Sequence, residues 1–152
     1  MRIAASDKVR PEQYNALAMA SREMRETNDC AVKAVATVCG VSYEVAHATL
    51  EKFGRKNGKG AHTYQIHDAV EFLGKSTRGV AIQYFIQKYP KGHRDVLKNV
   101  TTHHMARFNN VWADGKTYLV YTKGHVLAVV NGVNHDWTVG SSKQVVAIYE
   151  VI

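Results

Sequence analysis

Cysteine, proline and long apolar runs are scarce in this 152-residue chain. It holds two cysteines and two prolines, and no stretch approaches the ~18 apolar residues that cross a bilayer. The opening sequence, MRIAASDKVRPEQY, lacks the apolar core of a signal peptide. We therefore expect no membrane association and a place in the cytoplasm. The absence of a linker or repeat predicts one domain over residues 1–152.

The two cysteines, Cys30 and Cys39, lie on one predicted helix. Nine residues of helix separate them by ~13 Å along the axis and put them on opposite faces. We expect no disulfide between them, which suits a reducing compartment.

Acidic residues are fewer than basic ones, 13 against 20, which makes the formal net charge +7. The basic residues gather in GRKNGKG (54–60) and QKYPKGHR (87–94). Such charge predicts weak, nonspecific attraction to nucleic acid, because no helix or sheet signature that reads bases accompanies it. We expect 54–60 to be a mobile basic loop bordering a cleft, with Arg55 and Lys59 on the surface.

Helical periodicity dominates the first half of the chain. One predicted helix is apolar nearly all round, so it should be enclosed by the rest of the fold, and Gly40 should end it. Ser42 should cap the helix that follows it. The four predicted helices cover 11–24, 29–39, 42–53 and 64–73.

Strand-like patterns dominate the second half. Residues 101–109 are predicted to form a short helix, and the predicted strands are 79–85, 117–122, 124–132, 133–138 and 144–152. Helices first and antiparallel strands afterwards predict an α+β fold, with a mainly helical half over 1–76 and a mainly sheet half over 77–152.

The dipeptide Asn131-Gly132 predicts a hairpin, because both residues tolerate the positive φ of a type I′ turn. In that register Leu127 lies opposite Asp136, so His125 and Asp136 become diagonal neighbours within side-chain reach. A carboxylate there would hold the imidazole.

A cysteine at the start of a buried helix completes a candidate catalytic set. A helix N-terminus and a neighbouring imidazolium both lower a cysteine pKa, and the thiolate is the competent nucleophile. We therefore interpret Cys30 as nucleophile, His125 as base and Asp136 as the group that orients the base. Cys39, deep in the helix, is interpreted as a core residue.

The order Cys, His, Asp on a helical half followed by an antiparallel sheet resembles the papain-like cysteine peptidase superfamily. Two blocks, TNDCAVKAVATVCGVSYEVAH (27–47) and TYLVYTKGHVLAVVNGVNHDW (117–137), are similar to small phage and prophage proteins grouped with the bacteriocin-processing, C39-like peptidases. The resemblance implies a papain-like fold and the same three roles for Cys30, His125 and Asp136.

Papain-like peptidases usually carry an oxyanion-binding glutamine a few residues before the cysteine, and Met24 occupies that position here. Asn28 could donate its amide instead, together with the Cys30 backbone N–H. The alternative is that Asn28 is only the helix N-cap.

We expect no metal or other cofactor. His62 and His67 are five residues apart, and His103 and His104 are adjacent, so neither pair has the i, i+4 spacing that aims two imidazoles at one ion.

These observations support a hydrolase of peptide or isopeptide bonds, with a peptide or protein as substrate. Two alternatives stay open: an inactive papain-like scaffold that binds a host protein or nucleic acid, and an acyltransferase using the same triad.

Overall fold

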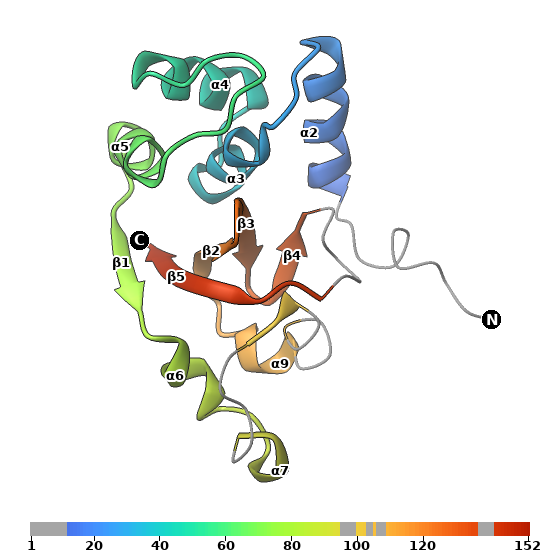
Figure 1. The fold of residues 1–152 in the computed structure, drawn as a ribbon, viewed down its shortest axis with the longest axis vertical. Helices are drawn as coiled ribbons and strands as arrows, with labels where there is room; N and C mark the ends of the chain where they lie inside the picture. The colour runs from blue at the N-terminus through green and yellow to red at the C-terminus, as the bar shows by residue number, and fades with distance from the viewer. Residues whose placement is uncertain (1–11, 95–99, 103–104, 106–108, 137–141) are drawn as a thin grey trace, which may run out of the picture.

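The computed structural model describes residues 12–94, 100–102, 105, 109–136 and 142–152. Four helices precede the sheet, as predicted: α2 (Glu12–Glu23), α3 (Cys30–Cys39), α4 (Tyr43–Lys52) and α5 (Thr63–Phe72). They form one layer above the sheet (Figure 1). Pro11, the predicted start of the first helix, lies outside the described residues.

The five strands are β1 (Thr77–Val80), β2 (Thr117–Thr122), β3 (His125–Val130), β4 (Val133–His135) and β5 (Val145–Val151). All pair antiparallel in the order β1-β5-β2-β3-β4. The α+β prediction is therefore confirmed at this level. Among the described residues, no helix has the length and apolar character that crossing a bilayer requires.

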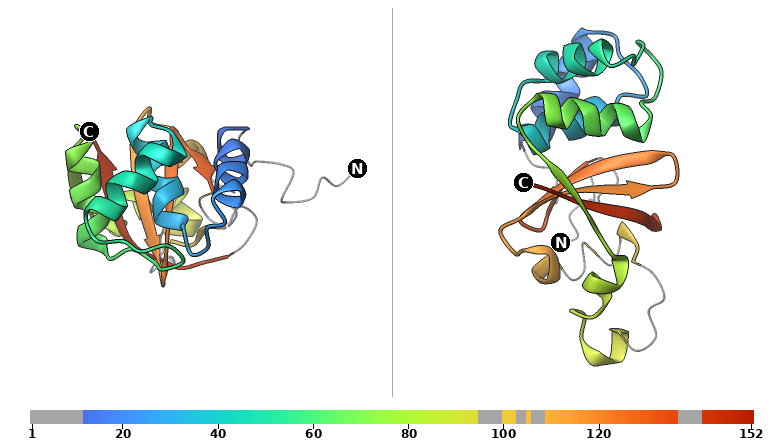
Figure 2. Two further views of the ribbon diagram at one scale, coloured as in Figure 1. Left: turned by 90° about the horizontal axis from the view of Figure 1, so that it is seen from above. Right: turned by 90° about the vertical axis from the view of Figure 1, so that its left-hand side faces the viewer.

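Both faces of the sheet are covered (Figure 2). Leu119, Val126 and Ala128 pack against the helical layer, whereas their neighbours Tyr118, Val120 and Leu127 belong to a second core on the opposite face. Short helices lie on that second face: α6 (Ile82–Ile86), α7 (Lys91–Arg94) and α9 (Asn109–Trp112). Burial on two faces explains why β3 reads as a nearly continuous apolar run.

The central helix α3 is enclosed as predicted. Val32 and Val35 have no exposed surface, and the helix packs on β3, α4 and α5. Gly40 ends it with a left-handed φ of 66°, and Ser42 caps α4 by accepting a hydrogen bond from the Val45 N–H at 3.1 Å. Because α3 is held on all sides, its first residue has a defined position.

The predicted strand 79–85 is wrong beyond Val80. Strand β1 ends at Val80, and Ile82–Ile86 form a helix whose Phe85 stacks on Trp112 with ring centroids 3.8 Å apart. Ile82, Phe85 and Ile86 have i, i+3, i+4 spacing, which is the helical pattern that buries one face. The predicted helix 101–109 and the end of the strand 133–138 lie largely outside the described residues.

Candidate active site

Cys30 is the first residue of α3 and is partly exposed. Its neighbour Asp29 occupies the N-cap position, but the Asp29 side chain makes no capping hydrogen bond. That carboxylate instead accepts hydrogen bonds from Ser21 Oγ at 2.5 Å and Tyr43 Oη at 2.6 Å, and it lies 3.5 Å from Lys33 Nζ. The Asp29 side chain therefore does not cap the first-turn N–H groups beside the sulfur.

His125 begins β3 directly after a turn through Gly124, whose φ is 69°. Its Nε2 lies 2.7 Å from Oδ2 of Asp136, which is 2% exposed. The hairpin that brings them together has the predicted register, since Val130 pairs with Val133 and Ala128 with His135 across the Asn131-Gly132 turn. Asp136 therefore orients the His125 ring through Nε2.

Cys30 and His125 are hydrogen-bond partners. Burial alone raises the pKa of the Cys30 thiol, but hydrogen bonds from His125 and from the Val126 N–H outweigh burial and bring the pKa below its ordinary value. Burial also disfavours the imidazolium, yet Asp136 and Cys30 raise the pKa of His125 to about 9. Both shifts favour a thiolate–imidazolium pair at neutral pH.

The turn before Cys30 is fixed by a buried carboxylate, Glu26. Its Oε2 lies 3.0 Å from Arg55 Nη1 and 2.7 Å from His47 Nε2, and its Oε1 accepts the Gly58 N–H at 2.6 Å. Arg55 also donates to the carbonyl of Thr27 at 3.4 Å. This cluster, which we call the Glu26 clamp, ties the loop 54–60 to the residues that lead into α3.

Two sequence predictions about this region need correction. Arg55 is not a surface residue of a mobile loop: it is 3% exposed, because it pairs with Glu26. Asn28 is not the N-cap, since that position belongs to Asp29. Asn28 adopts a left-handed φ of 50°, and its Nδ2 donates to the Gly58 carbonyl at 2.9 Å. Whether Asn28 also serves as an oxyanion donor stays a prediction.

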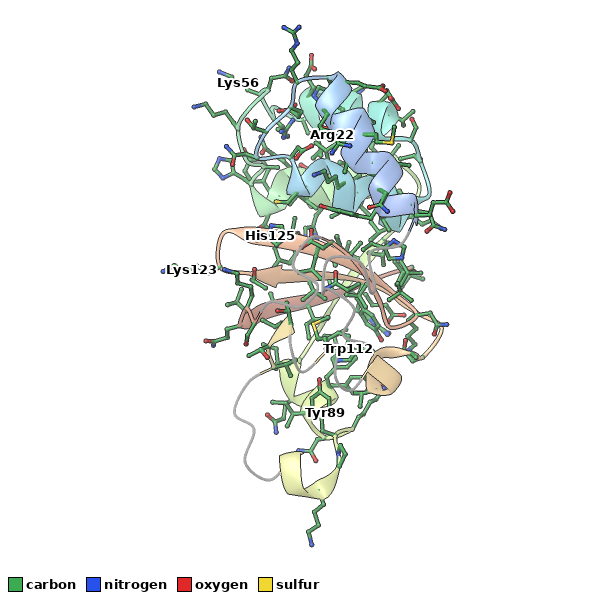
Figure 3. The ribbon with its side chains drawn as sticks, turned by 90° about the vertical axis from the view of Figure 1, so that its right-hand side faces the viewer. Arg22, Lys56, Tyr89, Trp112, Lys123 and His125 are labelled. Atoms are coloured by element: carbon green, nitrogen blue, oxygen red, sulfur yellow. The ribbon has the colours of Figure 1, made fainter. Side chains whose placement is uncertain are left out.

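A cleft passes the sulfur and has two arms. The apolar arm, about 820 Å³, is lined by groups that include Ile66, Tyr121 and Tyr149. The polar arm, about 510 Å³, is lined by groups that include Asn28 and Lys33. The arms meet at shared lining residues: Cys30, Gly60, Thr122, Lys123, Gly124, His125 and Lys143. Figure 3 shows His125 below the helical layer with Lys123 projecting away beside it.

Cys39 is partly exposed like Cys30, but the two differ in helix position and in pKa. It ends α3, it is partly exposed rather than deep in the core, and burial raises its pKa to about 11. The positive end of the helix dipole is at Cys30, one helix length away.

Sequence reasoning missed the residues that support this site. His67, on α5, lies 3.2 Å from Tyr121 Oη through Nε2 and 2.9 Å from Thr77 Oγ1 through Nδ1, and burial lowers its pKa. These contacts fix the Tyr121 ring, which lines the apolar arm. No local pattern announces such a contact, because 54 residues separate His67 from Tyr121.

No protein-family model, curated protein or solved structure matches this chain. In the described part of the chain, no three His, Cys, Asp or Glu side chains form a group that could hold a metal ion. His103 and His104 lie outside that part.

Proposed function

We propose that the chain is a papain-like cysteine hydrolase that cleaves a peptide or isopeptide bond through an acyl-enzyme on Cys30. One observation carries this proposal: Cys30, His125 and Asp136 form a hydrogen-bonded series at a helix N-terminus, where a cleft opens. A buried structural cysteine would not need that arrangement. As part of this proposal, the protein acts in the cytoplasm and resembles phage-encoded peptidases.

The reaction follows from the two charged partners. The Cys30 thiolate attacks the carbonyl carbon, and the developing oxyanion accepts hydrogen bonds from first-turn N–H groups of α3, with Asn28 close by. The His125 imidazolium gives its proton to the leaving nitrogen as the C–N bond breaks, which leaves a thioester. Water then attacks that thioester, His125 accepts a proton, and the C–S bond breaks to restore the thiolate.

Asp136 holds the imidazole in the required tautomer and stabilises its charged form. The Glu26 clamp contributes by holding the residues before Cys30, so that the sulfur and the first-turn N–H groups keep one geometry.

The test compares Cys30→Ala with Cys39→Ala, since each removes one sulfur from the same helix. Each protein is incubated with a library of peptides from a bacterial proteome, and new termini are counted by mass spectrometry. We expect cleavage by the wild type and by Cys39→Ala, and none by Cys30→Ala. Cleavage that survives in Cys30→Ala, or no cleavage by the wild type, would contradict the proposal.

The two rival functions predict different outcomes. If amine acceptors become joined to peptides while water does not compete, the chain is an acyltransferase using the same thioester. If every biological effect survives in Cys30→Ala but is lost in Lys56→Glu/Lys59→Glu, the chain is a binding module. Those two lysines are exposed, unlike Arg55, so their reversal tests surface charge without breaking the Glu26 clamp.

A further inference from the structure

The charged groups that line the cleft are almost all basic. Lys123 and Lys143 line both arms and Lys33 lines the polar arm, whereas Asp29 is the lining carboxylate. Asp29 is 6% exposed and is already bonded to Ser21, Tyr43 and Lys33. Its charge is therefore balanced within the protein. Lys123 and Lys143, at the junction where the two arms meet, are available to contact a bound molecule.

Neither junction lysine has a carboxylate partner in the described part of the chain. Both residues are exposed, and the ion pairs found there use other cations, namely Lys33, His47, Arg55, Arg78 and His125. Two lysines that line the cleft create a positive potential at its opening, and such a potential attracts anions and speeds their approach.

The apolar arm has the opposite character. Its lining includes Ile66, Val146, Tyr121 and Tyr149, and Tyr121 is held by His67. An arm of this kind accepts an aliphatic side chain, because most of its wall is apolar and burial of apolar surface is favourable.

We propose that the substrate is a peptide that carries a carboxylate at the junction and polar arm, held by Lys123 and Lys143, and an aliphatic side chain in the apolar arm. The inference rests on the proposed function and names its substrate class. The carboxylate comes either from an acidic side chain or from a free C-terminus. A nucleic acid would also meet the two lysines, but it has no acyl carbon for Cys30 and no aliphatic group for the apolar arm.

A first experiment needs no known substrate. Iodoacetate and iodoacetamide alkylate the same thiolate and differ in charge, so the ratio of their rates at Cys30 reports the local potential while the thiolate fraction cancels. We expect Lys123→Glu/Lys143→Glu to lower the iodoacetate-to-iodoacetamide ratio about fivefold at low ionic strength and hardly at all in 0.5 M salt. Lys56→Glu/Lys91→Glu, with the same change in net charge on exposed residues outside the cleft lining, should leave the ratio unchanged.

The outcomes separate the two proposals. If Cys30 reacts no faster than Cys39 with iodoacetamide, the proposed thiolate and the proposed function fail. If Cys30 reacts fast but the iodoacetate-to-iodoacetamide ratio is the same in wild type and Lys123→Glu/Lys143→Glu, the proposed role of the two lysines is refuted and the proposed function is not.

The substrate itself is then tested with Cys30→Ala, which binds without turnover, and hexapeptides that place leucine and glutamate two residues apart in both orders. We expect the glutamate peptides to bind more tightly than matched glutamine peptides. This preference should be lost when Lys123→Glu and Lys143→Glu are added to Cys30→Ala. Preference that survives C-terminal amidation identifies a side-chain carboxylate, and preference that amidation abolishes identifies a free C-terminus. Equal binding of glutamate and glutamine peptides, or binding of a single-stranded oligonucleotide in place of both, would overturn the proposal.

Discussion

Replacing Glu26 with glutamine tests the buried cluster that supports the candidate site. The change keeps the shape of the side chain and removes its charge, while Arg55 and His47 stay in place around it. The Glu26 side chain has no exposed surface, so solvent cannot substitute for the lost carboxylate. A buried cation left without its partner is a strongly destabilising defect.

The magnitude follows from the pKa of Glu26. Burial alone would raise that pKa, but Arg55, the Gly58 N–H, His47 and the Thr27 N–H together lower it from 4.5 to about 2. This difference corresponds to about 3 kcal/mol of preferential stabilisation of the carboxylate in the folded state. We therefore expect Glu26→Gln to lower the free energy of unfolding by about 3 kcal/mol at pH 7.

The pH dependence gives a second check with a defined sign. A carboxyl group whose folded-state pKa is depressed stabilises the fold fully above pH 4.5 and loses that contribution as the pH falls toward 2. The difference in free energy of unfolding between wild type and Glu26→Gln should thus narrow to about 1 kcal/mol at pH 3.

Urea unfolding followed by circular dichroism measures both quantities. The matched control is Glu51→Gln, because Glu51 also faces His47, at 4.0 Å, but its side chain is 69% exposed. The control should change stability by less than about 0.5 kcal/mol. Wild-type stability of Glu26→Gln at pH 7, or equal losses in both variants, would refute the reasoning.

Three further predictions concern the site and the core. In brief treatment with iodoacetamide at about pH 6.5, Cys30 should be labelled before Cys39, because the pKa of Cys30 is lowered and that of Cys39 is raised to about 11. If mass spectrometry finds both cysteines labelled equally slowly, the basis for a thiolate at Cys30 is removed. Val35→Asp should lower the free energy of unfolding by more than about 3 kcal/mol, since Val35 is fully buried, whereas Val45→Asp, at a position 45% exposed, should lower it little. A melting temperature of Val35→Asp close to that of the wild type would argue against the enclosed helix. Asp136→Asn should lower the pKa of His125 from about 9 toward 6.5, so the ring should lose its proton at a lower pH. An unchanged His125 pKa in an NMR titration would mean that the carboxylate does not control the ring.

Local pattern was enough for several parts of this fold. The apolar circumference of 29–39, the glycine after it and the serine cap of the next helix depend on interactions within a few residues, and each lies where it was expected. The Asn131-Gly132 turn set the register of β3 and β4 by itself, because a two-residue hairpin leaves one pairing. That register put His125 and Asp136 together.

Where the sequence prediction failed, a distant partner decided the outcome. The run over 79–85 contains β-branched and aromatic residues that suit a strand, but a buried surface under the sheet, including Trp112 and Tyr118, favours the helical face of Ile82–Ile86. Arg55 sits in a glycine-rich basic segment typical of an exposed loop, yet Glu26, 29 residues earlier, holds it inside.

The sequence therefore determined which residues are candidates for the proposed chemistry and the local geometry of each, since caps, turns and periodicity act over short distances. The tertiary structure alone decided that Cys30 meets His125, that Glu26 fixes the turn before the sulfur, and that two lysines stand at the junction of an apolar and a polar arm. Those relations join segments far apart in the chain, and their free energy comes from burial and charge pairing that exist only once the layers have packed.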